Sequence, residues 1–129
     1  MILLDTHVLV WSQLQGRKLS RAAASSIRRA RASDGLAISA ITLVELAGLI
    51  RWGKVGLHGS FEATTQEMIA KVTVKPITLD IAVLTAHFPP DFPSDPMDRI
   101  IAATSRAENL PLVTADERIL NCPLLKTIW

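Results

Sequence analysis

Four acidic residues occur where a predicted strand gives way to a helix, or in the first turn of a helix: Asp5, Glu45, Asp98 and Asp116. Carboxylates gathered in one partly buried place repel one another, and a bound divalent cation relieves that repulsion. All-oxygen ligands select a hard ion such as Mg²⁺ or Mn²⁺ over zinc. Such an ion can activate water and stabilise the leaving oxygen when a phosphodiester is displaced. The four acids therefore indicate metal-dependent phosphodiester chemistry, provided that the fold brings them together.

Each acid taken alone also has an ordinary structural explanation. Thr42 and Glu45 have the spacing of a capping box. Asp95 before a proline is typical of a helix N-cap, which puts Asp98 in the first turn, where the helix dipole favours a negative charge. Asp116 also suits an N-cap. For a single acid we favour the structural interpretation, and only the set as a whole favours a metal site.

The elements that would position these acids alternate along the chain. Short apolar runs without polar alternation are typical of strands buried on both faces, and we expect five of them, at 1–5, 36–40, 72–77, 110–114 and 124–128. Pro76 places the third at a strand end or a sheet edge. Helical spacing predicts helices at 20–32, 42–52, 60–71, 79–87, 96–108 and 116–121.

Strands that alternate with helices predict an α/β fold with a mainly parallel sheet. Right-handed crossovers then put every strand-to-helix junction at one edge of that sheet. Ligands of such folds bind outside the carboxyl ends of the strands, near the point where the strand order reverses. The sequence therefore predicts that the acids meet in one crevice.

The whole chain has 129 residues and is expected to form one domain over 1–129. Its hydrophobic fraction of 49% and charged fraction of 20% are typical of a globular protein. A single cysteine, Cys122, excludes an internal disulfide and a thiolate metal cage. No apolar run approaches the roughly 20 residues that span a bilayer, so we expect no membrane segment and a cytoplasmic protein.

A basic stretch without intervening acids is the main feature of the charge distribution, because the net charge is only +2. It is either a solvated helix face or a surface that guides the RNA backbone, and it comprises Arg17, Lys18, Arg21, Arg28, Arg29 and Arg31. His7 lies beside Asp5 and has two interpretations: it touches a bound phosphate, or it is a half-buried packing residue, which we favour.

Other chemistries have little support. There is no Gly-x-Gly-x-x-Gly and no Gly-Lys-Ser/Thr, so nucleotide-binding α/β classes lose their main signal. No serine lies in a Gly-x-Ser-x-Gly elbow. A phosphatase or receiver-like domain usually shows paired acids at the end of the first strand, whereas Asp5 is followed by Thr6 and His7.

Four segments, taken in order, resemble the motifs of PIN domains. Asp5-Thr6-His7 after an apolar strand resembles the opening motif, and 38–45 resembles the second, with Glu45 as its acid. Segments 95–104 and 112–116 resemble the third and fourth motifs. Together they cover nearly the whole chain. Within the family the chain resembles VapC, the toxin half of bacterial toxin–antitoxin pairs.

This resemblance implies a three-layer α/β/α sandwich and an endoribonuclease that depends on Mg²⁺ or Mn²⁺, with RNA as substrate, a homodimer and a small antitoxin partner. By position, the residues that bind metal and form the catalytic set would be Asp5, Glu45, Asp98 and Asp116. The positions expected behind the ligands or against phosphate are Thr6, Asp95, Arg99 and Thr114. The apolar positions Leu46, Leu49, Ile50 and Trp52 serve either the core or such a dimer.

The chain departs from its apparent relatives at two places. Relatives often carry lysine four residues after the second acid, where this chain has Leu49, and His-Arg where it has Pro93 and Ser94. Both departures remove positive charge near the expected site. They keep open a second hypothesis, a catalytically silent PIN-like module that binds RNA or a partner.

Overall fold

Five short parallel strands form one sheet in the order β3-β2-β1-β4-β5 in the computed structural model, which describes all 129 residues. The strands are β1 (Ile2–Leu4), β2 (Leu36–Ser39), β3 (Val72–Lys75), β4 (Leu112–Val113) and β5 (Thr127–Ile128). All five predicted strands are present, and every pairing is parallel. Strand β3 is an edge strand that ends just before Pro76, as predicted.

Seven α-helices and one 3₁₀ turn connect the strands: α1 (Thr6–Leu14), η1 (Gly16–Lys18), α2 (Arg21–Arg31), α3 (Ala40–Arg51), α4 (Phe61–Ile69), α5 (Leu79–Leu84), α6 (Pro96–Glu108) and α7 (Glu117–Leu120). Six of them were predicted. Helix α1 was not, because its apolar residues continue those of β1 and show little contrast between faces. Asp5 caps this helix by accepting a hydrogen bond from the backbone N–H of Thr6.

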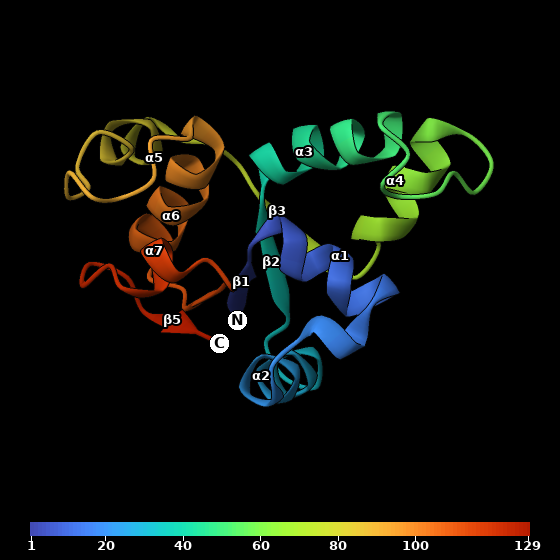
Figure 1. Cartoon of the computed structure of the whole chain (residues 1–129), viewed down its shortest axis with the longest axis horizontal. Coiled ribbons are helices and arrows are strands. Elements are labelled where there is room, and N and C mark those ends of the chain that lie inside the picture. The colour runs from blue at the N-terminus through green and yellow to red at the C-terminus, as the bar shows by residue number, and fades with distance from the viewer.

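The helices cover both faces of the sheet, which makes the molecule a three-layer α/β/α sandwich, as expected. Figure 1 shows β1 and β2 at the centre, with α1 and α4 on the right, α5, α6 and α7 on the left, and α2 below. Helix α2 packs in the same core as α1 and α4. Alternation along β1 separates two cores, because Ile2 and Leu4 face α1 to α4 whereas Leu3 faces α6 and α7. The continuous burial of β1 and β2 follows from this two-sided packing.

Helix α3 begins directly at the end of β2 and crosses toward α4 (Figure 1). Leu46 and Ile50 are 0% and 4% exposed and belong to the first core, and Leu49 packs against it. Of the two alternatives, the core therefore holds for these three residues. Trp52, at the end of the helix, is 74% exposed.

The sheet has one switch point, between β1 and β4. From β1 the chain moves outward through β2 to β3, and then returns to the other side of β1 for β4 and β5. Helices that follow β1 and β4 therefore diverge, and the ends of these two strands are the expected ligand site. No helix is long and apolar enough to cross a membrane.

Candidate active site

Asp5 lies at the switch point and is the most buried of the acids, at 9% exposed. Its Oδ1 accepts a hydrogen bond from the N–H of Thr6 at 2.8 Å, and its Oδ2 accepts one from the hydroxyl of Thr114 at 2.8 Å. Thr114 follows β4, so this second bond joins the ends of the two diverging strands. Burial raises the pKa of Asp5, and the two hydrogen bonds oppose that rise.

A chain of hydroxyl groups holds Glu45 beside Asp5. The Thr6 hydroxyl donates to Glu45 Oε1 at 2.6 Å and lies 3.0 Å from the Thr42 hydroxyl. Because the single hydrogen of Thr6 points to the carboxylate, Thr42 donates to Thr6. The capping-box prediction is wrong, since Ser39 caps α3 and Thr42 is a fully buried residue inside the helix. Glu45 thus stands in the second helical turn and faces the switch point.

Burial also raises the pKa of Glu45, which the hydrogen bond from Thr6 opposes and the charge of Asp5 reinforces. This dependence of one acid on the other shows that the ends of β1 and the start of α3 have been brought together. The sequence predicted Glu45 and Thr6 as site residues. It did not identify Thr42, although Thr42 and Glu45 are three residues apart and so share one face of α3.

Asp98 is the acid whose pKa is affected by all the other acids of the site. Its pKa is raised to about 7, first by burial and then by the charges of four other acids, which are Asp5, Asp95, Asp116 and Glu45. A carboxyl surrounded by like charge is stabilised in its protonated form. Folding has therefore collected the predicted acids from four separate segments.

Asp95 and Asp116 each cap a helix and also raise the pKa of Asp98. Asp95 caps α6 by accepting from the N–H of Met97 at 2.9 Å, and Asp116 caps α7 by accepting from the N–H of Arg118 at 2.9 Å. The N-cap interpretation of both is confirmed. Both also repel Asp98, so the structural and the electrostatic interpretations hold together.

The donor set suits a hard divalent cation. It consists of carboxylate and hydroxyl oxygens. The pKa values of Asp5, Glu45 and Asp98 are raised first by burial and then by the charges of other acids, and a bound cation would offset both effects. No three of the acidic side chains already stand close enough to share one ion. Binding would therefore require the half-buried Glu45 and Asp98 side chains to turn toward Asp5, which its two hydrogen bonds hold in place.

Thr6→Val tests whether the hydroxyl chain positions Glu45. The change keeps the shape of Thr6 but removes its hydrogen bonds to Glu45 and Thr42. We expect a loss of about 2 kcal/mol in the free energy of unfolding and a roughly tenfold weaker affinity for Mn²⁺. Chemical denaturation and calorimetric titration measure the two effects. Thr6→Ser keeps the hydroxyl and should restore both, and equal behaviour of the two variants would contradict a positioning role.

Arg99 lies near the acids in sequence but contacts none of them. Its Nε donates to the carbonyl of Pro93 at 2.8 Å, one terminal nitrogen donates to the carbonyl of Thr85 at 3.0 Å, and its guanidinium lies 5.8 Å from the Phe92 ring centroid. The expected pairing with a carboxylate is therefore wrong, whereas the expected contact with phosphate stays a prediction. Arg99 fixes the segment between α5 and α6.

The basic stretch does not lie as one unit beside the acids. Arg29 lines a hollow with Met1 and Ile2, and Arg31 lines another with Leu36 and Val72. These are the starts of strands, so the end of α2 lies at the edge of the sheet opposite to the acids (Figure 1). All six basic residues are exposed. Their guidance of RNA stays a prediction, and the position of this helix end does not favour it.

His7 is exposed, so the packing interpretation that we favoured is wrong. Its charge lowers the pKa of both Asp5 and Glu45, which places it within electrostatic reach of the site. The sequence signal was its position next to Asp5. His7 lies in the first turn of α1 on the side that faces solvent, whereas Thr6 before it is buried, so the His7 ring points outward.

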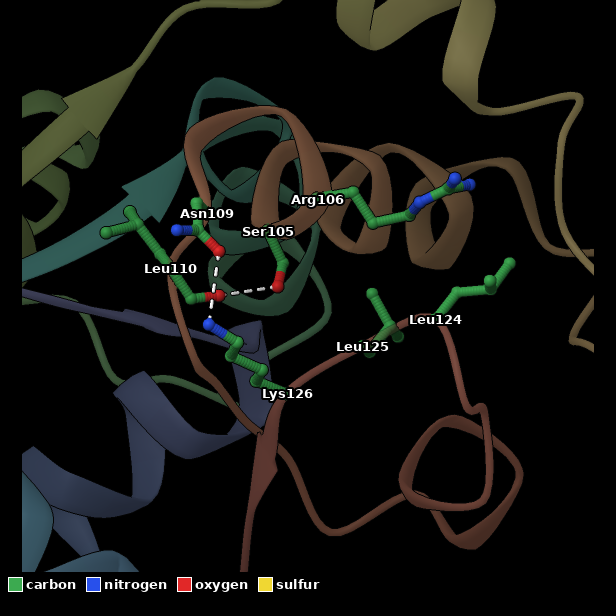
Figure 2. Close-up of a pocket in the computed structure, with 7 residues that line it drawn as sticks. All are labelled: Ser105, Arg106, Asn109, Leu110, Leu124, Leu125 and Lys126. Carbon is green, nitrogen blue, oxygen red and sulfur yellow. Dashed lines mark hydrogen bonds between the residues drawn. The ribbon is translucent and has the colours of Figure 1, made fainter.

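A separate surface hollow at the end of α6 contains none of the acids (Figure 2). Its polar groups are paired with each other, since the Ser105 hydroxyl donates to the Leu110 carbonyl at 2.6 Å and Lys126 Nζ donates to Asn109 Oδ1 at 3.3 Å. Asn109 ends α6 in the left-handed conformation, with φ of 53°. These contacts close the helix end, and no acid that could hold a cation lines this hollow.

Fold and site together define an α/β protein with an acidic site, suited to a divalent cation, at the switch point of a parallel sheet. The sequence matches the PIN domain family over residues 2–123. It is 35% identical to Ribonuclease VapC22 of Mycobacterium tuberculosis over 130 residues, covering 99% of this chain and 98% of that protein. The chain therefore belongs to the PIN-domain family.

Solved structures agree on the fold. A chain of VapBC2 from Rickettsia felis, bound to a DNA fragment from its promoter, superposes with a TM-score of 0.74 at 18% identity, over 98% of this chain and 97% of that one. A chain of DNA-bound VapBC from Salmonella typhimurium gives a TM-score of 0.72 at 19% identity over the same shares. At these identities the likeness establishes the three-layer architecture.

Proposed function

We propose that this protein is an endoribonuclease that depends on Mg²⁺ or Mn²⁺ and acts as the toxin of a toxin–antitoxin pair. The observation that carries the proposal is the convergence of four other acids on the half-buried Asp98, whose pKa is raised to about 7 by burial and by their charges. The 35% identity to a VapC ribonuclease over the full chain supports RNA as the substrate. VapBC complexes among the structural neighbours support a small antitoxin as the partner.

The residues that would hold the cation are Asp5, Glu45, Asp98 and Asp116, with Asp95 behind Asp98. When bound, a divalent cation supplies an acidified water and neutralises charge on the phosphate. Asp5 is the fixed point of the set, because Thr6 and Thr114 hold both of its oxygens. Glu45 is held next to it through Thr6. This geometry limits where a phosphodiester can lie, since the negative side chains repel it everywhere except at the cation.

No protein nucleophile is required by this scheme. Asp98 is the acid whose proton is most readily exchanged near neutral pH, and it stands in the first turn of α6, where the helix dipole favours its ionised form. Homodimer formation and a cytoplasmic location belong to the same proposal and rest on the resemblance to VapC.

Removing the metal is the direct test of this function. We expect the purified protein to cleave single-stranded RNA in the presence of Mn²⁺, to stop when a chelator is added, and to recover when Mn²⁺ is restored in excess. Gel analysis of a labelled oligonucleotide follows the reaction. A protein that neither binds Mn²⁺ in a calorimetric titration nor cleaves RNA would instead support the catalytically silent module.

A further inference from the structure

A row of aromatic rings begins beside the acids and runs along α1. His7 and Trp11 lie one helical turn apart, with ring centroids at 6.0 Å and an angle of 50° between the rings. Trp11 and Trp129 follow at 6.0 Å and 55°. Rings at such angles are not stacked face to face, and the exposed His7 ring is accessible to another planar group.

Trp11 is not explained by the hydrophobic core. Trp129 packs against the first core, whereas Trp11 packs against neither core, although it is a large apolar side chain. It is only partly buried, and His7 beside it is exposed. Trp129 thus supports Trp11 from the protein side, and the outer rings remain accessible.

A positive charge accompanies the rings. The Lys18 ammonium lies 5.6 Å from the Trp11 ring centroid, within the range of a cation–π contact. Lys18 is exposed and has no ion-pair partner, since the three salt bridges of the protein involve other residues. Of the basic residues expected to guide RNA, Lys18 alone lies against the aromatic row that leads from the acids.

We propose that His7, Trp11 and Lys18 form a binding site for the RNA strand adjacent to the acids, in which a nucleobase stacks on the rings and Lys18 contacts a phosphate. This inference rests on the proposed ribonuclease function. Aromatic rings beside a positive groove are the usual means of holding single strands without reading their sequence. A protein partner would favour apolar side chains, and apart from Leu14 at the end of α1 the exposed ones lie on other segments, at Leu57 and Phe61 among others.

Trp11→Leu is the decisive change, because leucine keeps an apolar side chain at the position but offers no ring face. We expect the KM for single-stranded RNA to rise roughly tenfold while kcat changes less than threefold and the affinity for Mn²⁺ is unchanged. Trp11→Phe should restore the KM. His7→Ala and Lys18→Ala, both at exposed positions, provide independent variants should Trp11→Leu fold poorly, and each should raise the KM.

The matched control is Trp52→Leu, which removes a tryptophan that also lies under a cation, Arg51, at 5.5 Å, but on another part of the surface. It should leave the KM unaltered. If wild type cleaves RNA and the Trp11, His7 and Lys18 variants keep its KM, the proposed binding site is overturned while the ribonuclease function stands. If these variants instead change only the oligomeric state in light scattering, the rings form a protein interface and the proposal is equally overturned.

Failure of the ribonuclease function itself is recognised separately. In that case wild type cleaves no RNA, and the ring site is decided by binding alone, through quenching of tryptophan fluorescence by an RNA oligonucleotide in the Trp52→Phe protein. Quenching that disappears in the additional Lys18→Ala variant supports the site. Absence of quenching overturns it.

Discussion

Replacing Asp5 with asparagine is expected to lower the rate of RNA cleavage by on the order of a thousandfold. A neighbouring acid cannot take over the role of Asp5, because Asp5 is buried and both of its oxygens accept hydrogen bonds that hold them in place. Asparagine has the same shape but no charge, so a cation loses its fixed ligand. Single-turnover cleavage in Mn²⁺ measures the loss, and calorimetry should show an affinity for Mn²⁺ at least a hundredfold weaker.

The folded state should survive this change. Removing a carboxyl group whose pKa is raised by burial relieves a desolvation cost, whereas the asparagine amide can accept only one of the two hydrogen bonds that Asp5 accepts. Because these effects oppose each other, we expect the metal-free Asp5→Asn protein to unfold within a few degrees of wild type. Asp91→Asn is the matched control, since Asp91 is an exposed acid between α5 and α6 that does not perturb Asp98. Cleavage by Asp5→Asn at the rate of the Asp91→Asn control would exclude the proposed site.

The sequence was sufficient for the architecture because buried parallel strands have a distinctive composition. Runs such as 36–40 are apolar on both faces, and alternation of such runs with helices leaves few topologies other than a parallel α/β sheet. Once the sheet is parallel, the strand-to-helix junctions share an edge. The meeting of Asp5, Glu45, Asp98 and Asp116 therefore follows from topology, and the electrostatic coupling of Asp98 to the other three agrees with it.

The features that the sequence did not predict depend on the environment of particular side chains and not on the pattern of apolar and polar residues. Helix α1 was missed because Val8, Leu9 and Val10 form a short apolar run in which the two valines are β-branched, as is typical of a strand. Thr42 was assigned to a capping box because the true helix start, at Ala40, is two residues earlier. Arg99 was assigned to the acids because carbonyl groups, its actual partners, leave no trace in a sequence.

Three acids of this site have a structural role and a site role together, which an interpretation of each residue alone does not reveal. Asp5, Asp95 and Asp116 each cap a helix, so the structural explanation is correct for all three. A cap, however, uses one carboxylate oxygen. The second oxygen of Asp95 accepts no protein hydrogen bond, and that of Asp5 accepts one from Thr114 but keeps a further lone pair for a ligand. Helix starts at the carboxyl edge of a parallel sheet thus supply acids that are already oriented by their own backbone.

The affinity for Mn²⁺ is expected to fall by about 25-fold between pH 7.5 and pH 5.5. A cation binds the ionised carboxylate, so below the Asp98 pKa of about 7 a proton must be displaced for each ion bound, and the affinity then falls about tenfold per pH unit. Calorimetric titration at both pH values, in buffers of different ionisation enthalpy, measures the affinity and the protons released. In Asp98→Asn the residual affinity should lose most of this dependence on pH.

The same pKa fixes the sign of the stability change in the metal-free protein. Between pH 4 and pH 7 the folded protein holds a proton on Asp98 that the unfolded chain, with a carboxyl pKa near 3.8, has released. The free energy of unfolding must therefore fall as the pH rises through this window, and the raised pKa values of Asp5 and Glu45 act in the same direction. Mn²⁺ should reverse the trend, because its stabilisation grows as the acids ionise. Thermal unfolding from pH 5 to pH 8, with and without Mn²⁺, distinguishes this from a purely structural acid cluster, for which the two curves would coincide.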